Sequence, residues 1–217
     1  FNVILNVNHI SAGRLTKFKE FSKGIPASQN PLPGPTSGFV SSTPAPIVYV
    51  PLTLEMKFEL DEIGFTPILA DHESEDFKKL TEVLEDQLKV AIKYKYASQP
   101  FTLKLIKFES SKSNTTSTTV RLRWENEDEK KMPSVKEVTE MLTKYLSFHD
   151  GHIGGNHISS KTLNVENLVD ECKTSNRTSC THLCDFQKMT LLFKCSCPDS
   201  FVLQNEFNCV DRHKFSF

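Results

Sequence analysis

The stretch FTLKLIKFESSKSNTTSTTVRLRW, residues 101–124, decides the fold because alternating apolar and polar residues stand on both sides of a polar segment. The apolar positions are Phe101, Leu103, Leu105, Val120, Leu122 and Trp124. A period of two is typical of a half-buried β-strand, so the stretch predicts two antiparallel strands joined in a hairpin. We expect residues 109–119 to form a long, compliant loop. We also expect Arg121 and Arg123 to lie on the solvent-facing side of the second strand.

Two amphipathic helices and two further strands are predicted around this hairpin. Alternation over residues 52–60 predicts a strand before it. Residues 75–94 predict a helix, because their apolar side chains fall on one helical face. Ser134 and Glu137 form a capping-box pattern ahead of a second helix, and residues 158–165 predict a weaker fourth strand. The order β-α-β-β-α-β favours an α+β fold with both helices on one face of an antiparallel sheet.

Composition excludes several classes of protein. The 217 residues suffice for one or two small domains and a linker. The 26 basic and 27 acidic residues are mixed along the chain and give a net charge of -1, which argues against a nucleic-acid partner. No run approaches the roughly 18 apolar residues of a membrane-spanning helix. The chain has neither an initiator Met nor a signal peptide, so we expect an internal piece of a longer protein.

The six cysteines indicate the compartment. They are Cys172, Cys180, Cys184, Cys195, Cys197 and Cys209. Such density is typical of a disulfide-bonded module, which persists in oxidising environments. The spacing alone leaves 15 connectivities open, although Cys195 and Cys197 must reach different partners. Glycosylation sequons at Asn114 and Asn176 agree with a secreted or cell-surface glycoprotein.

Residues 1–48 form a segment of biased composition. It holds six of the eleven prolines, spread through Ser, Thr and Gly. Such composition favours extended, solvated conformations. An O-glycosylated, mucin-like stalk and a plain flexible linker both fit.

The cysteine spacing resembles that of an epidermal growth factor-like (EGF-like) domain over residues 167–211, with residues 212–217 beginning a following segment. Phe193 and the sequence CSCPDSF at residues 195–201 carry the resemblance, with Ser200 where the family usually has Gly. The resemblance implies the pairs Cys172–Cys184, Cys180–Cys195 and Cys197–Cys209. It does not imply calcium binding here. Asp170 and Glu171 match the family's calcium ligands, but Leu168 and Lys188 stand where other oxygen ligands are needed.

Residues 49–166 resemble a SEA domain (named for sperm protein, enterokinase and agrin). The resemblance rests on LEMKFELDEIGFTPILADHESEDFKKLTEVLEDQLKVAIKY, residues 54–94, and on LKLIKF, residues 103–108. It implies a ferredoxin-like βαββαβ fold. A SEA domain followed by an EGF-like domain occurs in membrane-tethered mucins, matrix proteoglycans and adhesion receptors. We therefore expect a parent chain that is membrane-anchored outside this fragment.

Many SEA domains cut their own backbone between Gly and Ser at the start of the third strand. Matching the strand alternation places Thr116 at the Gly position and Ser117 at the nucleophile. A β-branched residue is poorly suited to the strained conformation that this reaction needs. The long predicted loop would also relax the strain, so we expect no self-cleavage at Thr116–Ser117.

A second candidate site is HDGHIGGNH, residues 149–157. Its three imidazoles, of His149, His152 and His157, are ligands that zinc accepts. The glycines between them break any helix, and a Gly-rich connection is the favoured interpretation. We expect no metal, no cofactor and no enzymatic activity.

The sequence thus predicts a structural and adhesive extracellular module with protein or glycan partners. The alternative is a signalling function, with the EGF-like domain as a receptor ligand.

Overall fold

The structure is a computed structural model that describes residues 46–126, 128, 132–174 and 180–212. Nearly all of the predicted stalk at residues 1–48, the sequon at Asn176 and residues 213–217 therefore lie outside the described residues. No helix in the described part of the chain is both long and apolar enough to cross a membrane.

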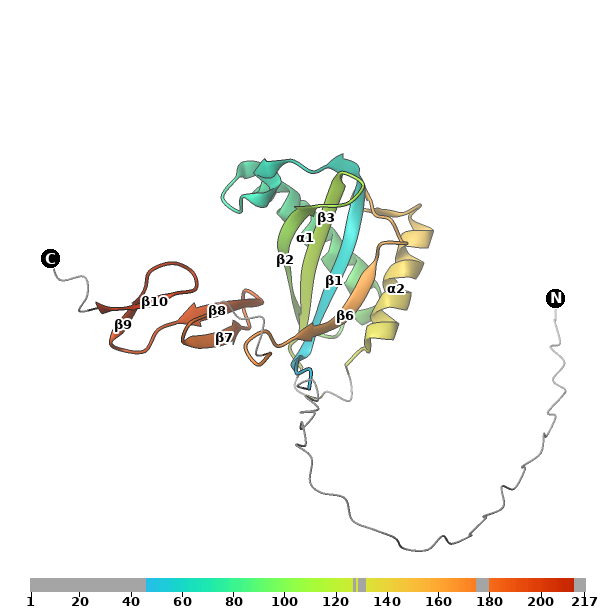
Figure 1. Cartoon of the computed structure of the whole chain (residues 1–217). Coiled ribbons are helices and arrows are strands. Elements are labelled where there is room, and N and C mark those ends of the chain that lie inside the picture. Colours follow the sequence, from blue (N-terminus) through green and yellow to red (C-terminus); the bar gives the residue numbers. More distant parts are fainter. Residues whose placement is uncertain (1–45, 127, 129–131, 175–179, 213–217) are drawn as a thin grey trace, which may run out of the picture. The chain divides into compact units, whose positions relative to one another are not determined.

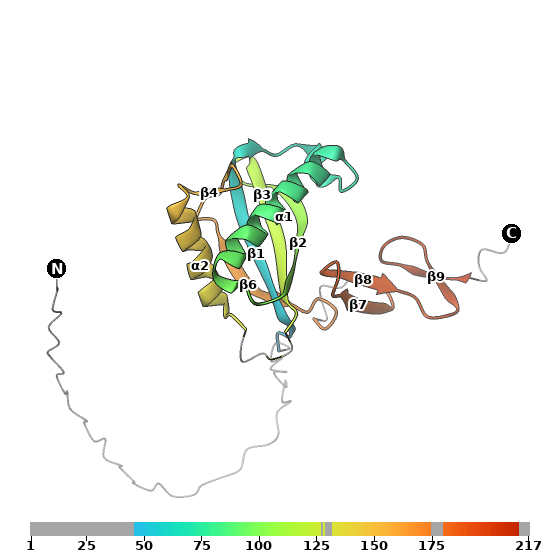
Figure 2. The same ribbon diagram turned by 180° about the vertical axis from the view of Figure 1, so that it is seen from behind.

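A four-stranded antiparallel sheet carries two helices, as the βαββαβ pattern predicts (Figure 1). Its elements are β1 (Tyr49–Gly64), a short 3-10 helix η1 (Pro67–Ala70), α1 (Glu75–Tyr96), β2 (Phe101–Ser110), β3 (Thr115–Trp124), α2 (Val135–Phe148) and β6 (Asn164–Val169). The strand order is β2-β3-β1-β6, with each neighbouring pair antiparallel. Both helices lie on one face of the sheet, behind it in Figure 1 and in front of it in Figure 2. We call this part, Tyr49–Val169, the sheet module.

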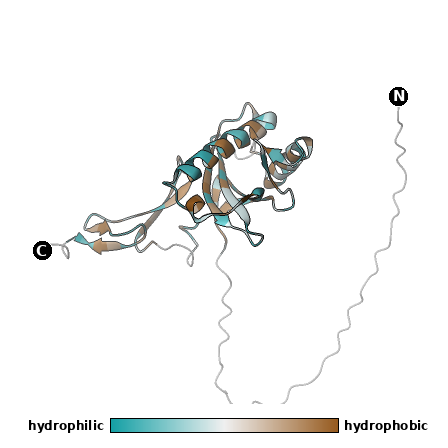
Figure 3. Ribbon diagram, turned by 90° about the horizontal axis from the view of Figure 1, so that it is seen from above, coloured by the Kyte–Doolittle hydropathy of each residue, from teal (hydrophilic) through white to brown (hydrophobic). Residues whose placement is uncertain are grey.

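The core lies between the sheet and the helices. Alternate residues of β1 and β3 point into it, so Met56, Leu60, Val120 and Leu122 are fully buried. Both helices are banded in hydrophobic and hydrophilic residues, as an amphipathic helix on a sheet requires (Figure 3). Trp124, the largest buried side chain, packs edge-on against other aromatic rings at the end of β3. The sequence alternation therefore locates the core.

Local sequence signals set the beginning of each helix. The Ser74 side chain accepts a hydrogen bond from the Phe77 amide at 3.1 Å. Ser134 and Glu137 form the predicted capping box, in which each side chain bonds the other's backbone N–H. These bonds satisfy amides that a helix leaves unpaired in its first turn.

The predicted fourth strand is displaced along the chain. It begins at Asn164 instead of residue 158. Ile158 makes only an isolated bridge to Leu60. The Thr162 amide and hydroxyl then both donate to the Ser159 carbonyl, at 3.0 and 2.9 Å, and close a turn that interrupts the strand. Because side-chain hydroxyls compete with strand pairing for backbone groups, this polar turn makes β6 begin later in the sequence.

Arg121 lies on the predicted side of β3, but the expectation that it faces solvent is wrong. Only 7% of this residue is exposed, although it lies on the sheet face opposite the helices. Arg123, on the same face, is half-buried and donates to the Pro51 carbonyl at 2.8 Å. Segments distant in sequence pack over these arginines, and a strand pattern alone does not reveal such contacts.

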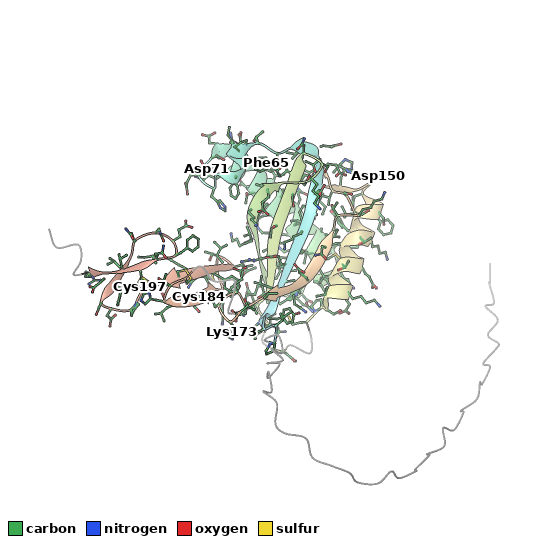
Figure 4. The ribbon with its side chains drawn as sticks, in the orientation of Figure 1. Phe65, Asp71, Asp150, Lys173, Cys184 and Cys197 are labelled. Atoms are coloured by element: carbon green, nitrogen blue, oxygen red, sulfur yellow. A yellow bond between two sulfur atoms is a disulfide. The ribbon has the colours of Figure 1, made fainter. Side chains whose placement is uncertain are left out.

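The C-terminal part, Cys172–Asp211, forms short hairpins closed by disulfides, and we call it the disulfide module. Its strands are β7 (Leu183–Gln187), β8 (Leu192–Ser196), β9 (Phe201–Leu203) and β10 (Cys209–Asp211), paired β7 with β8 and β9 with β10. Cys172 bonds Cys184, Cys180 bonds Cys195, and Cys197 bonds Cys209. These are the pairs that the EGF-like resemblance implies (Figure 4 labels Cys184 and Cys197). Three disulfides indicate an oxidising, extracellular or secreted environment.

Candidate functional site: the β2–β3 hairpin

The hairpin that joins β2 and β3 is short. The strands run to Ser110 and resume at Thr115, which leaves a loop of residues 111–114. The Asn114 amide bonds the Ser111 carbonyl at 3.3 Å, and the Ser111 amide bonds the Thr115 carbonyl at 3.0 Å. The prediction of a long, compliant loop over residues 109–119 is therefore wrong. Its Ser and Thr residues have no apolar alternation, yet their side chains fit strands well.

Asn114 carries the unusual backbone of this turn. Its φ is 59°, in the left-handed region that Asn tolerates better than most residues. Its carbonyl, which belongs to the peptide bond with Thr115, accepts a hydrogen bond from the Phe65 amide at 3.3 Å. Phe65, labelled in Figure 4, directly follows β1. The turn is thus held by a neighbouring segment as well as by its own bonds.

A network of hydroxyls and one carboxylate fills the tip of the hairpin. Oε2 of Glu59, on β1, accepts from Ser113 Oγ at 3.0 Å and from Thr115 Oγ1 at 3.1 Å. Ser111 Oγ lies 2.7 Å from Thr115 Oγ1 and also accepts from the Ser113 and Thr115 amides. The Thr115 hydroxyl is therefore oriented by a carboxylate and by a neighbouring serine.

Thr116 and Ser117, at which we expect no self-cleavage, lie within β3 and outside this turn. Thr116 is fully buried within β3, opposite Leu60 on β1 and Ser110 on β2. Ser117 follows it in the same paired strand. Neither residue has a positive φ. Within the hairpin, the bond that joins a left-handed residue to a hydroxyl residue is Asn114–Thr115, two positions before Thr116–Ser117.

Sequence analysis missed the network around Thr115, which consists of Glu59, Ser111 and Ser113. Glu59 comes from β1, 54 residues before Ser113, so no local pattern connects them. Asn114 itself carried a usable signal, because Asn is one of the few residues that accept a left-handed conformation at a hairpin. Chemically, this site can orient the Thr115 hydroxyl next to the Asn114 carbonyl. It can also present the exposed Asn114 side chain to a glycosyltransferase.

The structure brings two of the three histidines together: the rings of His152 and His157 meet edge to face, with centroids 5.1 Å apart. The His149 ring packs on Tyr145, with centroids 4.2 Å apart. His157 Nδ1 lies 2.9 Å from Asp61 Oδ2, and His152 Nδ1 lies 2.9 Å from the Asp150 carbonyl. The described residues contain no group of three or more His, Cys, Asp or Glu side chains arranged to hold a metal ion.

The Gly-rich segment around these histidines is a small hairpin. Its strands are β4 (His152–Ile153) and β5 (Asn156–His157). Gly154 and Gly155 turn between them with φ of 62° and 82°. The histidines therefore connect α2 to the sheet through local contacts.

The acidic pair at the entrance of the disulfide module is engaged within the chain. Asp170 Oδ1 accepts from the Cys172 amide at 3.1 Å, and Oδ2 lies 3.3 Å from Lys173 Nζ. Glu171 Oε1 lies 3.4 Å from Nη2 of Arg121. These carboxylates act as structural partners of nearby residues.

A scan against protein-family models finds no match for the chain, and a search of curated proteins finds no similar sequence.

Proposed function

We propose that the chain is a non-catalytic structural and adhesive module of an extracellular glycoprotein, built from a SEA domain and an EGF-like domain. The disulfide module carries this proposal. Its three bonds join the first cysteine to the third, the second to the fourth and the fifth to the sixth. That pairing, in a module of few buried residues, suits a small extracellular domain.

The topology of the sheet module supports the SEA assignment. A strand order of β2-β3-β1-β6, with both helices on one face, is the arrangement expected of a ferredoxin-like βαββαβ fold. The short β2–β3 hairpin corresponds to the joint that other SEA domains cut. Here the joint is Asn114–Thr115 instead of Gly–Ser, and it carries a glycosylation sequon. We propose that it stays covalently continuous and bears a glycan.

In this function the chain would hold neighbouring domains apart and contact other extracellular molecules. Its partners would be extracellular proteins or glycans, and its parent chain would be tethered at a membrane. The three histidines of residues 149–157 make local contacts, such as that of His157 with Asp61. The alternative function is receptor signalling by the EGF-like domain, which the same disulfide pairing would serve.

One experiment separates the two functions. The purified 217-residue chain is immobilised and exposed to matrix glycoproteins and a glycan array, and in parallel it is added to cells that carry growth-factor receptors. Binding to a matrix protein or a glycan without receptor phosphorylation is the expected result. Receptor phosphorylation without such binding would replace the adhesive function with signalling.

A further inference from the structure

Arg121 is a buried charge in the middle of β3, on the sheet face away from the helices. Only 8% of its side chain is exposed. Removing a guanidinium from water is costly unless charged and polar partners surround it. The groups that bind Arg121 therefore show which contact offsets the cost of burying its charge.

The partners of Arg121 belong to both modules. Within the sheet, Nε donates to Glu55 Oε2 on β1 at 2.9 Å. Nη1 donates to the Leu191 carbonyl at 2.8 Å, and Nη2 donates to Glu171 Oε1 at 3.4 Å. The guanidinium carbon lies 5.4 Å from the centroid of the Phe193 ring. One side chain thus joins the sheet to the β7–β8 turn and to the segment just before Cys172.

Leu191 gives the β7–β8 turn a defined conformation. It is fully buried, yet it is not part of the core between sheet and helices. Its φ of 57° is rare for a large apolar residue and persists only where surrounding contacts fix it. Its amide bonds the Gln187 carbonyl at 2.8 Å, while its own carbonyl receives Arg121. Burial of the side chain and bonding of the carbonyl therefore act on the same residue.

We propose that Arg121 is a latch that fastens the β7–β8 turn to the sheet, so that the two modules move as one body. The latch also withholds Leu191 and one face of Phe193 from outside partners. Both modules fall within one compact unit. This inference does not depend on the proposed function, because a spacer and a signalling ligand could both contain such a latch.

The chain offers a matched control for this latch. Arg123 lies two residues further along β3, on the same face, but its hydrogen bonds go to the Pro51 carbonyl and to Thr53 Oγ1. These partners belong to the sheet module. Arg123→Met therefore removes a similar side chain without touching the disulfide module. In the Arg121→Met variant, Glu55 still has a cationic partner, because Lys57 Nζ lies 2.8 Å from its other carboxylate oxygen.

The test measures whether the modules tumble together. Nitrogen-15 relaxation of the full chain gives separate rotational correlation times for β1 and β3 and for β7 and β8. Hydrogen exchange follows the Leu191 amide. In the wild type and in Arg123→Met we expect one shared correlation time. In Arg121→Met we expect a clearly shorter time for β7 and β8, with exchange at Leu191 faster by about tenfold or more.

Further variants keep the outcome decisive. Arg121→Lys retains the charge but not the planar fork, so its exchange should lie between wild type and Arg121→Met. Leu191→Ala loosens the contact from the side of the disulfide module and carries the test if Arg121→Met unfolds the sheet. Intact mass must show three disulfides in every variant. Two correlation times in the wild type would overturn the latch. So would a single shared time in both Arg121→Met and Leu191→Ala.

Discussion

Glu85 is a carboxylate on α1 that is only 8% exposed and faces the edge strand of the sheet. Its Oε1 accepts a hydrogen bond from the Leu105 amide at 2.9 Å. The pairing of β2 with β3 shifts register between Leu105 and Lys107, at a β-bulge. A side chain of the helix thus bonds a backbone group next to that bulge.

Glu85→Ala should lower the free energy of unfolding by about 1–3 kcal/mol, because it leaves the buried Leu105 amide without this acceptor. Glu85→Gln keeps a carbonyl oxygen and should cost less. Urea unfolding measures both effects. The control is Glu82→Gln on the exposed face of the same helix, which should change stability by less than about 0.5 kcal/mol. Equal losses in Glu85→Ala and Glu82→Gln would contradict the role given to this bond.

Glu55 makes stability depend on acid pH. Burial raises the pKa of its carboxyl, but hydrogen bonds from Lys57 and Arg121, together with their charges, outweigh burial and hold the pKa below the ordinary value of 4.5. A carboxyl with a lowered pKa contributes stability that is complete above its unfolded value and is lost as the pH falls through the folded value.

Glu55→Gln should therefore be less stable than the wild type at neutral pH, with a gap that narrows as the pH falls below 4.5. Urea unfolding of both chains at several pH values between about 7 and about 3 measures the gap. A gap of constant size across this range would show that the carboxylate charge does not contribute.

At the scale of single elements, short-range signals were predictable and long-range contacts were not. The capping box of α2 involves Ser134 and Glu137, three residues apart, so the sequence contains the whole interaction. The environment of Arg121 depends on Leu191, 70 residues away. The start of β3 was missed because Thr116 and Thr118 place hydroxyls where a hydrophobic pattern expects apolar side chains, and both are fully buried. The left-handed backbone of Asn114, with a φ of 59°, is likewise a feature that only the fold reveals.

The cap of α2 should be worth about 1 kcal/mol. Ser134→Ala removes the acceptor for the Glu137 amide and one partner of the Glu137 carboxylate. We expect the free energy of unfolding to fall by that amount in urea titrations. Thr143→Ala, at an exposed position of the same helix, should change it by less than about 0.5 kcal/mol. A larger loss in Thr143→Ala than in Ser134→Ala would contradict this assignment.

The β2–β3 hairpin should remain uncut and carry a glycan. Secreted protein from animal cells should run as one chain after reduction and denaturation. Treatment with a glycosidase specific for N-linked glycans should lower its mass, and Asn114→Gln should lose part of that shift. An additional chain that begins at Thr115 would show that the Asn114–Thr115 bond is cut. An unchanged glycan mass in Asn114→Gln would show that this sequon is unused.

At the scale of the whole molecule, the two modules are stabilised in different ways. The hydrophobic core cluster runs from Leu54 to Val165 and includes none of the described residues of the disulfide module. Among the described residues of that module, only Leu191 and Cys195 are buried, and its disulfides span 12, 15 and 12 residues. Closing a loop of about 15 residues is worth about 3 kcal/mol in the chain-entropy account. A module with so small a core depends on these bonds.

Reduction should therefore unfold the disulfide module and leave the sheet module folded. After treatment with a thiol reductant and alkylation, hydrogen exchange should become fast throughout β7–β10, while β1, β3 and α1 keep their protection. Circular dichroism should retain the helical signal, because both helices pack on the core of the sheet module.

The latch predicts one further change, at Arg121. Without a folded β7–β8 turn its guanidinium loses the Leu191 carbonyl, so the β3 amides around it should exchange faster than those near Trp124. Loss of protection throughout both modules would mean that the sheet module depends on the disulfides for its own stability.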